Sequence, residues 1–165
     1  MCDIHIFTDG SCWNNGRSNA RAGYAVVFPE HRDWDEGRAL ETTERQTNNR
    51  GELWAILRGL EILVEHKEQL LELQDIHIYT DSQLCMNIFT QWILKWKRNG
   101  WRKADGKQIE NLDLIQRIYE IVHGFHHVNK WTVYFEHVRA HTGGTSYEAY
   151  WNDVVDRLAQ SVIKH

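Results

Sequence analysis

A six-residue pattern occurs twice in this chain, and each copy ends in aspartate. Residues 4–9 read IHIFTD and residues 76–81 read IHIYTD. Both copies alternate apolar and amphipathic side chains, which predicts strands, and the small or polar residues that follow favour strand ends. If the strands lie side by side, parallel and in register, Asp9 and Asp81 are roughly 5 Å apart. Such charges repel unless a cation neutralises them, so the pair predicts a Mg²⁺ site at the carboxyl ends of two central strands.

The rest of the chain predicts a mixed α/β fold. Three further strands are expected at residues 22–28, 38–47 and 131–138. Helices are expected from residue 48 onward, at about 82–97 and 110–123, and at 149–163. Strands joined by short connections favour an antiparallel meander, whereas a crossover helix can place the second aspartate strand parallel to the first. We therefore expect a five-stranded mixed sheet, with its first three strands antiparallel, its last two parallel to the first, and helices on its faces.

Composition limits the classes of protein to which the chain can belong. With 165 residues, a single proline and no low-complexity linker, we expect one domain over residues 1–165. The formal net charge of −4 gives no global basic field, so any polyanion must bind a local patch. Three cysteines without a CxxC pair disfavour a disulfide framework or a zinc site. No apolar run approaches about 20 residues and no signal-peptide pattern is present, so we expect a cytoplasmic or other intracellular monomer without a membrane partner.

A helix start near residue 48 carries a further acidic candidate. Glu52 is expected in the first turn, where the helix macrodipole favours a carboxylate. Asn48, Asn49 and Arg50 precede it, so this helix end offers amides, free backbone N–H groups and a guanidinium that can receive a phosphate. Taken alone, a favourable helix charge and ordinary capping residues explain these positions equally well.

Five segments together resemble the motifs of type 1 ribonuclease H. They are TDGSC at 8–12, TNNRGE at 47–52, YTDSQ at 79–83, VRAHTG at 138–143 and NDVVDRLA at 152–159. The segments follow the family's order and cover almost the entire chain. The resemblance is to the catalytic domain alone of cellular ribonuclease H1-like enzymes, without an additional N-terminal hybrid-binding module. It implies the ribonuclease H-like fold and an endonuclease that hydrolyses the RNA strand of RNA/DNA hybrids, giving 5′-phosphate and 3′-hydroxyl ends with little sequence specificity.

The resemblance implies four metal-binding catalytic carboxylates: Asp9, Glu52, Asp81 and Asp156. They would hold two Mg²⁺ ions, with Mn²⁺ as a substitute, one ion activating water and the other stabilising the departing 3′ oxygen. Asp156 is preferred to Asp153 because Asn152 lies four residues before it, as in family members. His141 matches a family histidine on a loop beside the metals and would assist proton transfer or product release.

A basic protrusion is expected at about residues 91–106. Residues 91–103 hold five Lys or Arg side chains, no acidic residue and three interleaved tryptophans. This pattern fits either an amphipathic helix with indoles facing the core or a groove that binds phosphates and stacks on sugars or bases. The resemblance favours the groove, with Trp92 and Trp96 on the DNA strand. It also assigns a DNA phosphate to Arg45, Thr47 and Asn111. Amides that could read the RNA 2′-hydroxyl are Asn15, Asn48, Asn49 and Gln83.

Two other function classes are compatible with parts of this pattern. An integrase-like DNA-cutting enzyme would share the acidic strand ends, but it would be expected to lack the Asn/Gln set and the TNNRGE helix start. A non-catalytic hybrid-binding module would keep the Trp/basic patch and lose carboxylates. All four carboxylates are present in this chain, which favours the enzyme.

Overall fold

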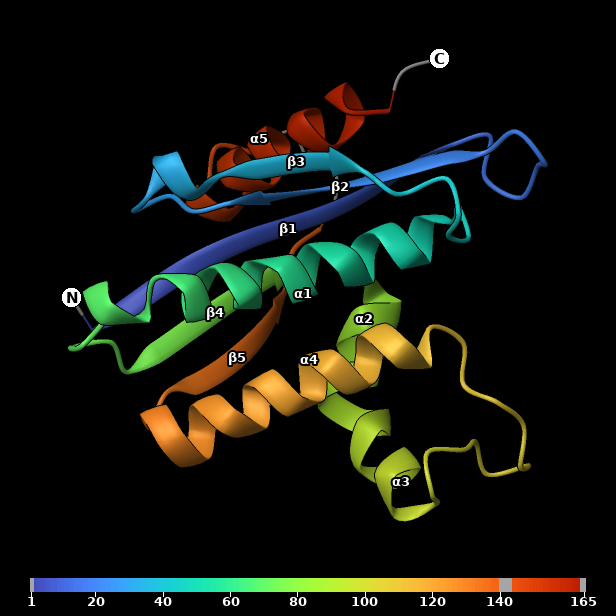
Figure 1. Cartoon of the computed structure of the whole chain (residues 1–165). Helices are drawn as coiled ribbons and strands as arrows, with labels where there is room; N and C mark the ends of the chain where they lie inside the picture. The colour runs from blue at the N-terminus through green and yellow to red at the C-terminus, as the bar shows by residue number, and fades with distance from the viewer. Residues whose placement is uncertain (1, 140–143, 164–165) are drawn as a thin grey trace.

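The computed structural model describes residues 2–139 and 144–163, which form a five-stranded sheet with helices on both faces (Figure 1). The strands are β1 (Asp3–Trp13), β2 (Arg21–Val27), β3 (Glu36–Ala39), β4 (Asp75–Thr80) and β5 (Thr132–His137). Their order across the sheet is β3-β2-β1-β4-β5. The β1–β2 and β2–β3 pairs are antiparallel, and the β1–β4 and β4–β5 pairs are parallel. The predicted mixed sheet is confirmed.

The two copies of the six-residue pattern pair with each other position for position. Their isoleucines are fully buried on the sheet face that carries the main core: Ile4, Ile6, Ile76 and Ile78. On the opposite face, the rings of Phe7 and Tyr79 stack with centroids 4.2 Å apart. A slip of either strand by one residue would move its side chains to the wrong face, so the apolar pattern excludes that register.

The first strand does not end at Asp9, as the sequence suggested. It continues to Trp13 because β2 supplies backbone partners along its other edge, from Gly10 opposite Tyr24 to Trp13 opposite Arg21. Only β4 ends at the expected place. The site is therefore one strand end beside one uninterrupted strand, rather than two strand ends.

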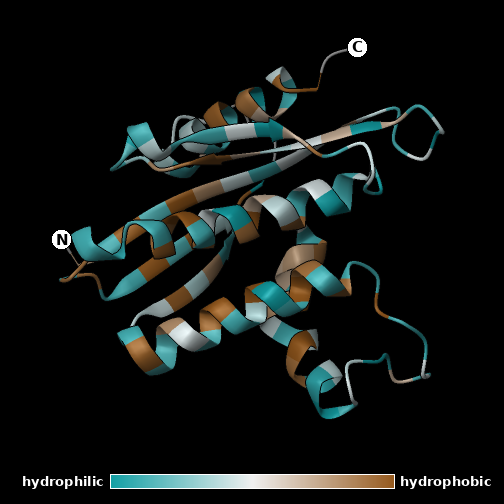
Figure 2. Cartoon of the chain, in the orientation of Figure 1, coloured by the Kyte–Doolittle hydropathy of each residue, from teal (hydrophilic) through white to brown (hydrophobic). Residues whose placement is uncertain are grey.

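The helices enclose the sheet unequally. The longer ones are α1 (Asn48–Glu65), α4 (Leu112–Gly124) and α5 (Tyr147–Ser161). Shorter elements are η1 (Arg32–Trp34), η2 (Lys67–Gln69), α2 (Gln83–Asn87), η3 (Ile88–Trp92), α3 (Ile93–Arg98) and η4 (Phe125–Asn129). Helices α1 and α4 cover the main core, whereas α5 covers a smaller apolar cluster on the other face. Figure 2 shows hydrophobic and hydrophilic bands alternating along α1 and α4, as expected for helices with one face on a core. No described helix has the length and apolarity needed to span a membrane.

The third strand is shorter than the predicted 38–47 and ends at Ala39. Beyond it, the side chain of Gln46 takes over the role of a strand backbone. Its Oε1 accepts a hydrogen bond from the Ala22 backbone N–H at 2.8 Å, while its Nε2 donates to the Glu41 carbonyl at 2.8 Å. A polar segment can leave the sheet in this way because a glutamine amide both donates and accepts.

Candidate metal centre and nucleic-acid interface

Three of the four predicted carboxylates lie together where β1, β4 and α1 meet. Asp9 is on β1 and is 2% exposed, Glu52 is on α1 and is 3% exposed, and Asp81 directly follows β4 and is partly exposed. One carboxylate oxygen from each residue lies within 4.8 Å of the other two. Three hard oxygen donors converging in this way could hold a metal ion.

Two glycines bring Glu52 to this position. A Cβ atom on Gly10 would lie 2.2 Å from the Glu52 nitrogen, and a Cβ on Gly51 would lie 2.6 Å from the Gly23 carbonyl oxygen. Hence only hydrogen atoms can separate the backbone of α1 from that of β1. The helix begins at Asn48 with Thr47 as its N-cap. Glu52 therefore lies in the second turn, and the prediction that it lies in the first turn was wrong. Close backbone approach, rather than the helix macrodipole, accounts for its place in the site.

The electrostatics of the cluster call for a cation. Neither Asp9 Oδ2 nor Glu52 Oε2 has a hydrogen-bond partner within the part of the chain that the structure describes. Burial raises the pKa of the Asp9 carboxyl, and the nearby Glu52 and Asp81 charges raise it further. Burial and the charge of Asp81 likewise raise the pKa of Glu52. Buried carboxylates without donors are costly unless they are protonated or neutralised, so the donor set fits a divalent cation.

The metal-free protein is expected to lose stability as the pH rises above about 5. Between the ordinary carboxyl pKa near 4 and the raised folded pKa values, the folded state holds protons that the unfolded state has released, so the free energy of unfolding falls with pH. Urea unfolding in EDTA from about pH 5 to pH 8 measures this slope. Saturating Mg²⁺ should flatten it, because the cation replaces the protons.

The Asp9→Asn protein is the control for this measurement. His5 also has a raised pKa, through its hydrogen bond to Glu30, and its stabilisation is lost in the same direction. Glu36 and Asp113 have lowered pKa values and lose their stabilisation only below about pH 4. The difference between wild type and Asp9→Asn therefore isolates the cluster. Identical slopes in the two proteins would contradict the assignment.

The last helix presents Asp156, not Asp153, to the centre. Asp156 lies close enough to Asp9 to raise the Asp9 pKa through a side-chain hydrogen bond. Asp153 is exposed and forms an ion pair with Arg157 at 3.0 Å. Asp156 lies in the third turn of α5. It stands at the edge of the three-carboxylate cluster, and its role as fourth ligand stays a prediction.

Predicted His141 lies outside the described residues. A histidine that the sequence reasoning missed, His137, ends β5 and contacts the Asp81 carbonyl oxygen through Nε2 at 3.3 Å. Only the parallel pairing of β4 with β5, which sets His137 opposite Thr80, reveals this neighbour. His137 therefore contacts the backbone of Asp81, one of the three clustered carboxylate residues.

The predicted amide residues lie around the start of α1 and the start of α2. Asn48 and Asn49 are exposed in the first turn of α1, and the Asn15 side chain accepts a hydrogen bond from the Asn48 N–H at 3.2 Å. Gln83 is exposed at the start of α2. The structure therefore joins Asn15 to the helix start and leaves these amides at the surface beside the carboxylates.

Trp92 and Trp96 of the basic protrusion contact the core and also line a surface cleft. Their rings lie 5.7 Å apart and pack partly buried against the main core. The same two indoles line a cleft of about 110 Å³ together with Asn49, Lys103 and Asn111. The predicted DNA-strand residues and one predicted phosphate residue are therefore brought to one cleft, whereas Arg45 is exposed on the loop before α1.

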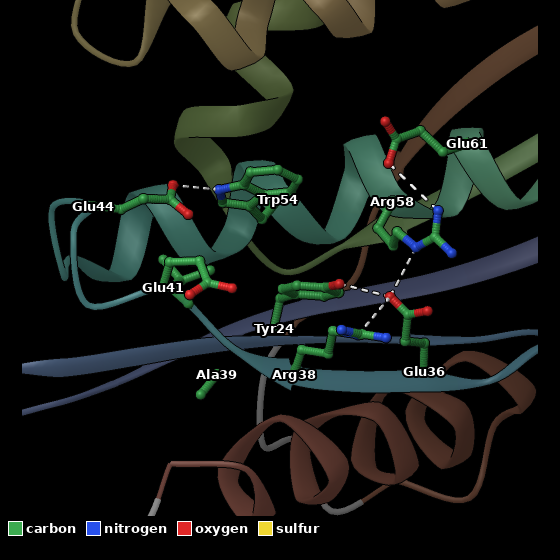
Figure 3. Close-up of a pocket in the computed structure, with 10 residues that line it drawn as sticks. Tyr24, Glu36, Arg38, Ala39, Glu41, Glu44, Trp54, Arg58 and Glu61 are labelled. Carbon is green, nitrogen blue, oxygen red and sulfur yellow. Dashed lines mark hydrogen bonds and ion pairs between the residues drawn. The ribbon is translucent and has the colours of Figure 1, made fainter.

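A larger hollow of about 310 Å³ lies apart from the carboxylates, between α1 and β3 (Figure 3). Its acidic wall is internally compensated. Glu36 accepts hydrogen bonds from the Tyr24 hydroxyl at 2.6 Å and from Arg58 at 2.8 Å, and Glu44 accepts one from the Trp54 indole at 2.7 Å. These carboxylates stabilise the contact of α1 with the sheet rather than offering a site for a cation.

Comparison with known proteins identifies the family. The family model for RNase H matches residues 2–164. The chain belongs to the RNase H family. Ribonuclease H of Escherichia coli O127:H6 is 37% identical over 158 residues, which covers 96% of this chain and 87% of that protein. Ribonuclease H1 of Mus musculus is 31% identical over 161 residues, which covers 98% of this chain and 50% of the relative, so the chain spans about half that protein's length.

A solved structure agrees with this RNase H assignment. LC9-RNase H1, described as a type 1 RNase H with the type 2 active-site motif, matches with a TM-score of 0.63 and 26% identity. The match covers 99% of this chain and 74% of that one. The family and fold expected from the motifs are confirmed, and the cluster of Asp9, Glu52 and Asp81 is the candidate metal centre of this RNase H.

Proposed function

We propose that this RNase H is an endonuclease that hydrolyses the RNA strand of RNA/DNA hybrids, leaving 5′-phosphate and 3′-hydroxyl ends. The observation that carries the proposal is the cluster of Asp9, Glu52 and Asp81 beside a surface of amides, in which the buried Asp9 Oδ2 and Glu52 Oε2 accept no hydrogen bond from the described residues. Phosphodiester hydrolysis requires an activated water and a stabilised leaving oxygen, and carboxylate-bound divalent metals are suited to both tasks.

We propose Mg²⁺ as the metal, as two ions per site, with Mn²⁺ as a substitute. Hard carboxylate oxygens support this choice, as do Asp9 Oδ2 and Glu52 Oε2, which lack hydrogen-bond partners among the described residues. When bound, the ions would supply a water nucleophile near neutral pH and offset charge on the departing 3′ oxygen. Asp9 and Glu52 would hold their oxygens rigidly because both are buried in the sheet–helix contact. Asp81 and Asp156 would complete the ligand set, and His141 would move protons.

Recognition of the hybrid is assigned to three groups of side chains. The amides of Asn15, Asn48, Asn49 and Gln83 would read the 2′-hydroxyl, because an amide can both donate to it and accept from it. The indoles of Trp92 and Trp96 would carry the DNA strand. Arg45, Thr47 and Asn111 would hold a DNA phosphate away from the scissile bond. An intracellular, monomeric protein remains part of this proposal and follows from the cysteine pattern and composition.

A labelled hybrid duplex incubated with Mg²⁺ tests the proposal directly. The RNA strand of the hybrid should be cut, whereas duplex DNA and duplex RNA of the same sequence should stay intact, because neither combines a 2′-hydroxyl strand with a deoxyribose strand. Products should be ligatable at their 3′ ends. Cleavage of duplex DNA would instead favour an integrase-like enzyme, and tight hybrid binding without cleavage would favour a non-catalytic module.

A further inference from the structure

Arg50 occupies the junction between the loop before α1 and the start of α4. Its Nε donates to Glu44 Oε1 at 2.7 Å, Nη1 donates to Asn111 Oδ1 at 3.2 Å and to Asp113 Oδ1 at 3.1 Å, and Nη2 donates to Asp113 Oδ2 at 2.8 Å. These bonds use four of the five guanidinium N–H donors. The side chain is only 13% exposed. Arg50 is therefore not available as the phosphate ligand that the sequence suggested.

The contact with Arg50 determines which end of the Asn111 amide faces outward. Guanidinium N–H groups only donate, so the atom facing Arg50 must be the amide oxygen. Asn111 is the N-cap residue of α4 with φ of 58°, yet its side chain makes no capping bond. Its oxygen is committed to Arg50, and the two N–H donors of Nδ2 are left for another acceptor. The side chain lines the cleft with Trp92 and Trp96.

The backbone of the same arginine acts on Thr47. The Arg50 N–H donates to Thr47 Oγ1 at 3.2 Å, which caps α1. Because the hydroxyl oxygen accepts this bond, its own proton is free to be donated elsewhere. Arg50 thus donates to Thr47 Oγ1 and to Asn111 Oδ1. The Thr47 hydroxyl and the Asn111 amide each keep N–H or O–H groups that can donate to another molecule.

Glu44 holds the arginine in this orientation. The same Oε1 atom that accepts from Arg50 Nε also accepts from the Trp54 indole N–H at 2.7 Å, which is visible in Figure 3. Ion pairs with Glu44 and Asp113 neutralise the positive charge of Arg50. The positive potential that attracts an anion must therefore come from exposed residues such as Arg45 and Lys103.

We propose that Arg50 is a positioning residue that leaves the Asn111 amide N–H groups and the Thr47 hydroxyl proton as donors on one surface, and thereby makes this surface selective for a phosphate of the DNA strand. This inference rests on the proposed hybrid substrate and deepens it. A phosphate diester offers only acceptors, so it is bound by two outward donors and is repelled by an amide turned the other way. Arg50 acts through Thr47 and Asn111 without touching the substrate.

The test combines variants with hybrids in which single DNA phosphates are replaced by neutral methylphosphonates. For wild type, one replacement should raise KM about tenfold and leave kcat nearly unchanged, as expected for losing a charge-assisted hydrogen bond made equally in ground and transition states. Arg50→Met removes the bond to Asn111 but keeps the backbone bond to Thr47, so it should raise KM about tenfold on the unmodified hybrid, and the replacement should then have a smaller further effect. Arg117→Met is the matched control, because Arg117 pairs with Glu61 at 2.7 Å in the same α1–α4 contact.

A second variant decides the matter if Arg50→Met does not fold. Asn111→Asp keeps an oxygen for Arg50, so the folded state should be retained, but it places a carboxylate oxygen where Nδ2 was. Its KM should rise at least as much, with loss of the same phosphate sensitivity. Wild-type KM and unchanged phosphate sensitivity in the folded variants would overturn the role of Arg50. Failure of wild type to cut any hybrid would instead overturn the proposed function.

Discussion

An Asp9→Asn protein is expected to lose at least about a thousandfold in hybrid cleavage while unfolding at a higher temperature than wild type. The amide matches the carboxylate in shape, so packing is unchanged. It removes one of three converging negative charges, two of which are buried. The remaining carboxylates then bind metal poorly, and the cost of burying the Asp9 carboxyl beside Glu52 and Asp81, which raises its pKa, is removed. We expect a gain of about 2 kcal/mol in the unfolding free energy without metal.

The opposite signs of these two effects distinguish a metal site from a structural one. The measurements are kcat on a hybrid with Mg²⁺ and the thermal midpoint in EDTA. Asp33→Asn, at an exposed position in η1, is the matched control and should change neither. Loss of stability together with loss of activity would make Asp9 a structural residue, and retained activity would place the chemistry elsewhere.

The two central strands could be predicted from the sequence because the same short alternating pattern occurs at residues 4–9 and 76–81. The two aspartate strands share an alternation that places all four isoleucines on one buried face, and the observed pairing sets Phe7 against Tyr79 and brings Asp9 near Asp81. Asp156 followed instead from the resemblance, because family members have an Asn four residues before the Asp, and residues 152 and 156 then share one helix face. Asn152 is indeed buried, whereas Asp153 faces outward.

Other features depend on contacts that no local pattern encodes. The third strand ends at Ala39. Beyond it, the Gln46 side chain, and not a strand backbone, accepts the hydrogen bond from the Ala22 N–H of β2. The sequence suggested Arg50 as a phosphate ligand because it does not reveal the partners of this side chain. Glu44 lies in the loop before α1, and Asp113 lies in α4. In both cases a polar side chain found an intramolecular partner whose position only the folded chain defines.

Replacing Gly10 by alanine is expected to destabilise the protein by about 3 kcal/mol or more and to reduce activity further than the loss of folded protein explains. The new Cβ would lie 2.2 Å from the Glu52 nitrogen and 2.5 Å from the Gly51 carbonyl carbon. Both are backbone atoms, so no rotamer change relieves the contact and α1 must move away from β1. That movement carries Glu52 away from Asp9.

The matched control is Gly124→Ala, at the end of α4, where an added Cβ meets nothing within 4 Å. This substitution should be neutral or stabilising by up to about 1 kcal/mol, because alanine loses less backbone entropy in a helix. Urea unfolding of both variants gives the stabilities, and Mg²⁺-dependent kcat of the folded fraction gives the effect on the site. Should Gly10→Ala match Gly124→Ala in both, close backbone approach would not be what positions Glu52. Since the same contact places the proposed metal ligands Asp9 and Glu52, its loss should also weaken stabilisation by Mg²⁺, which the unfolding curves measure directly.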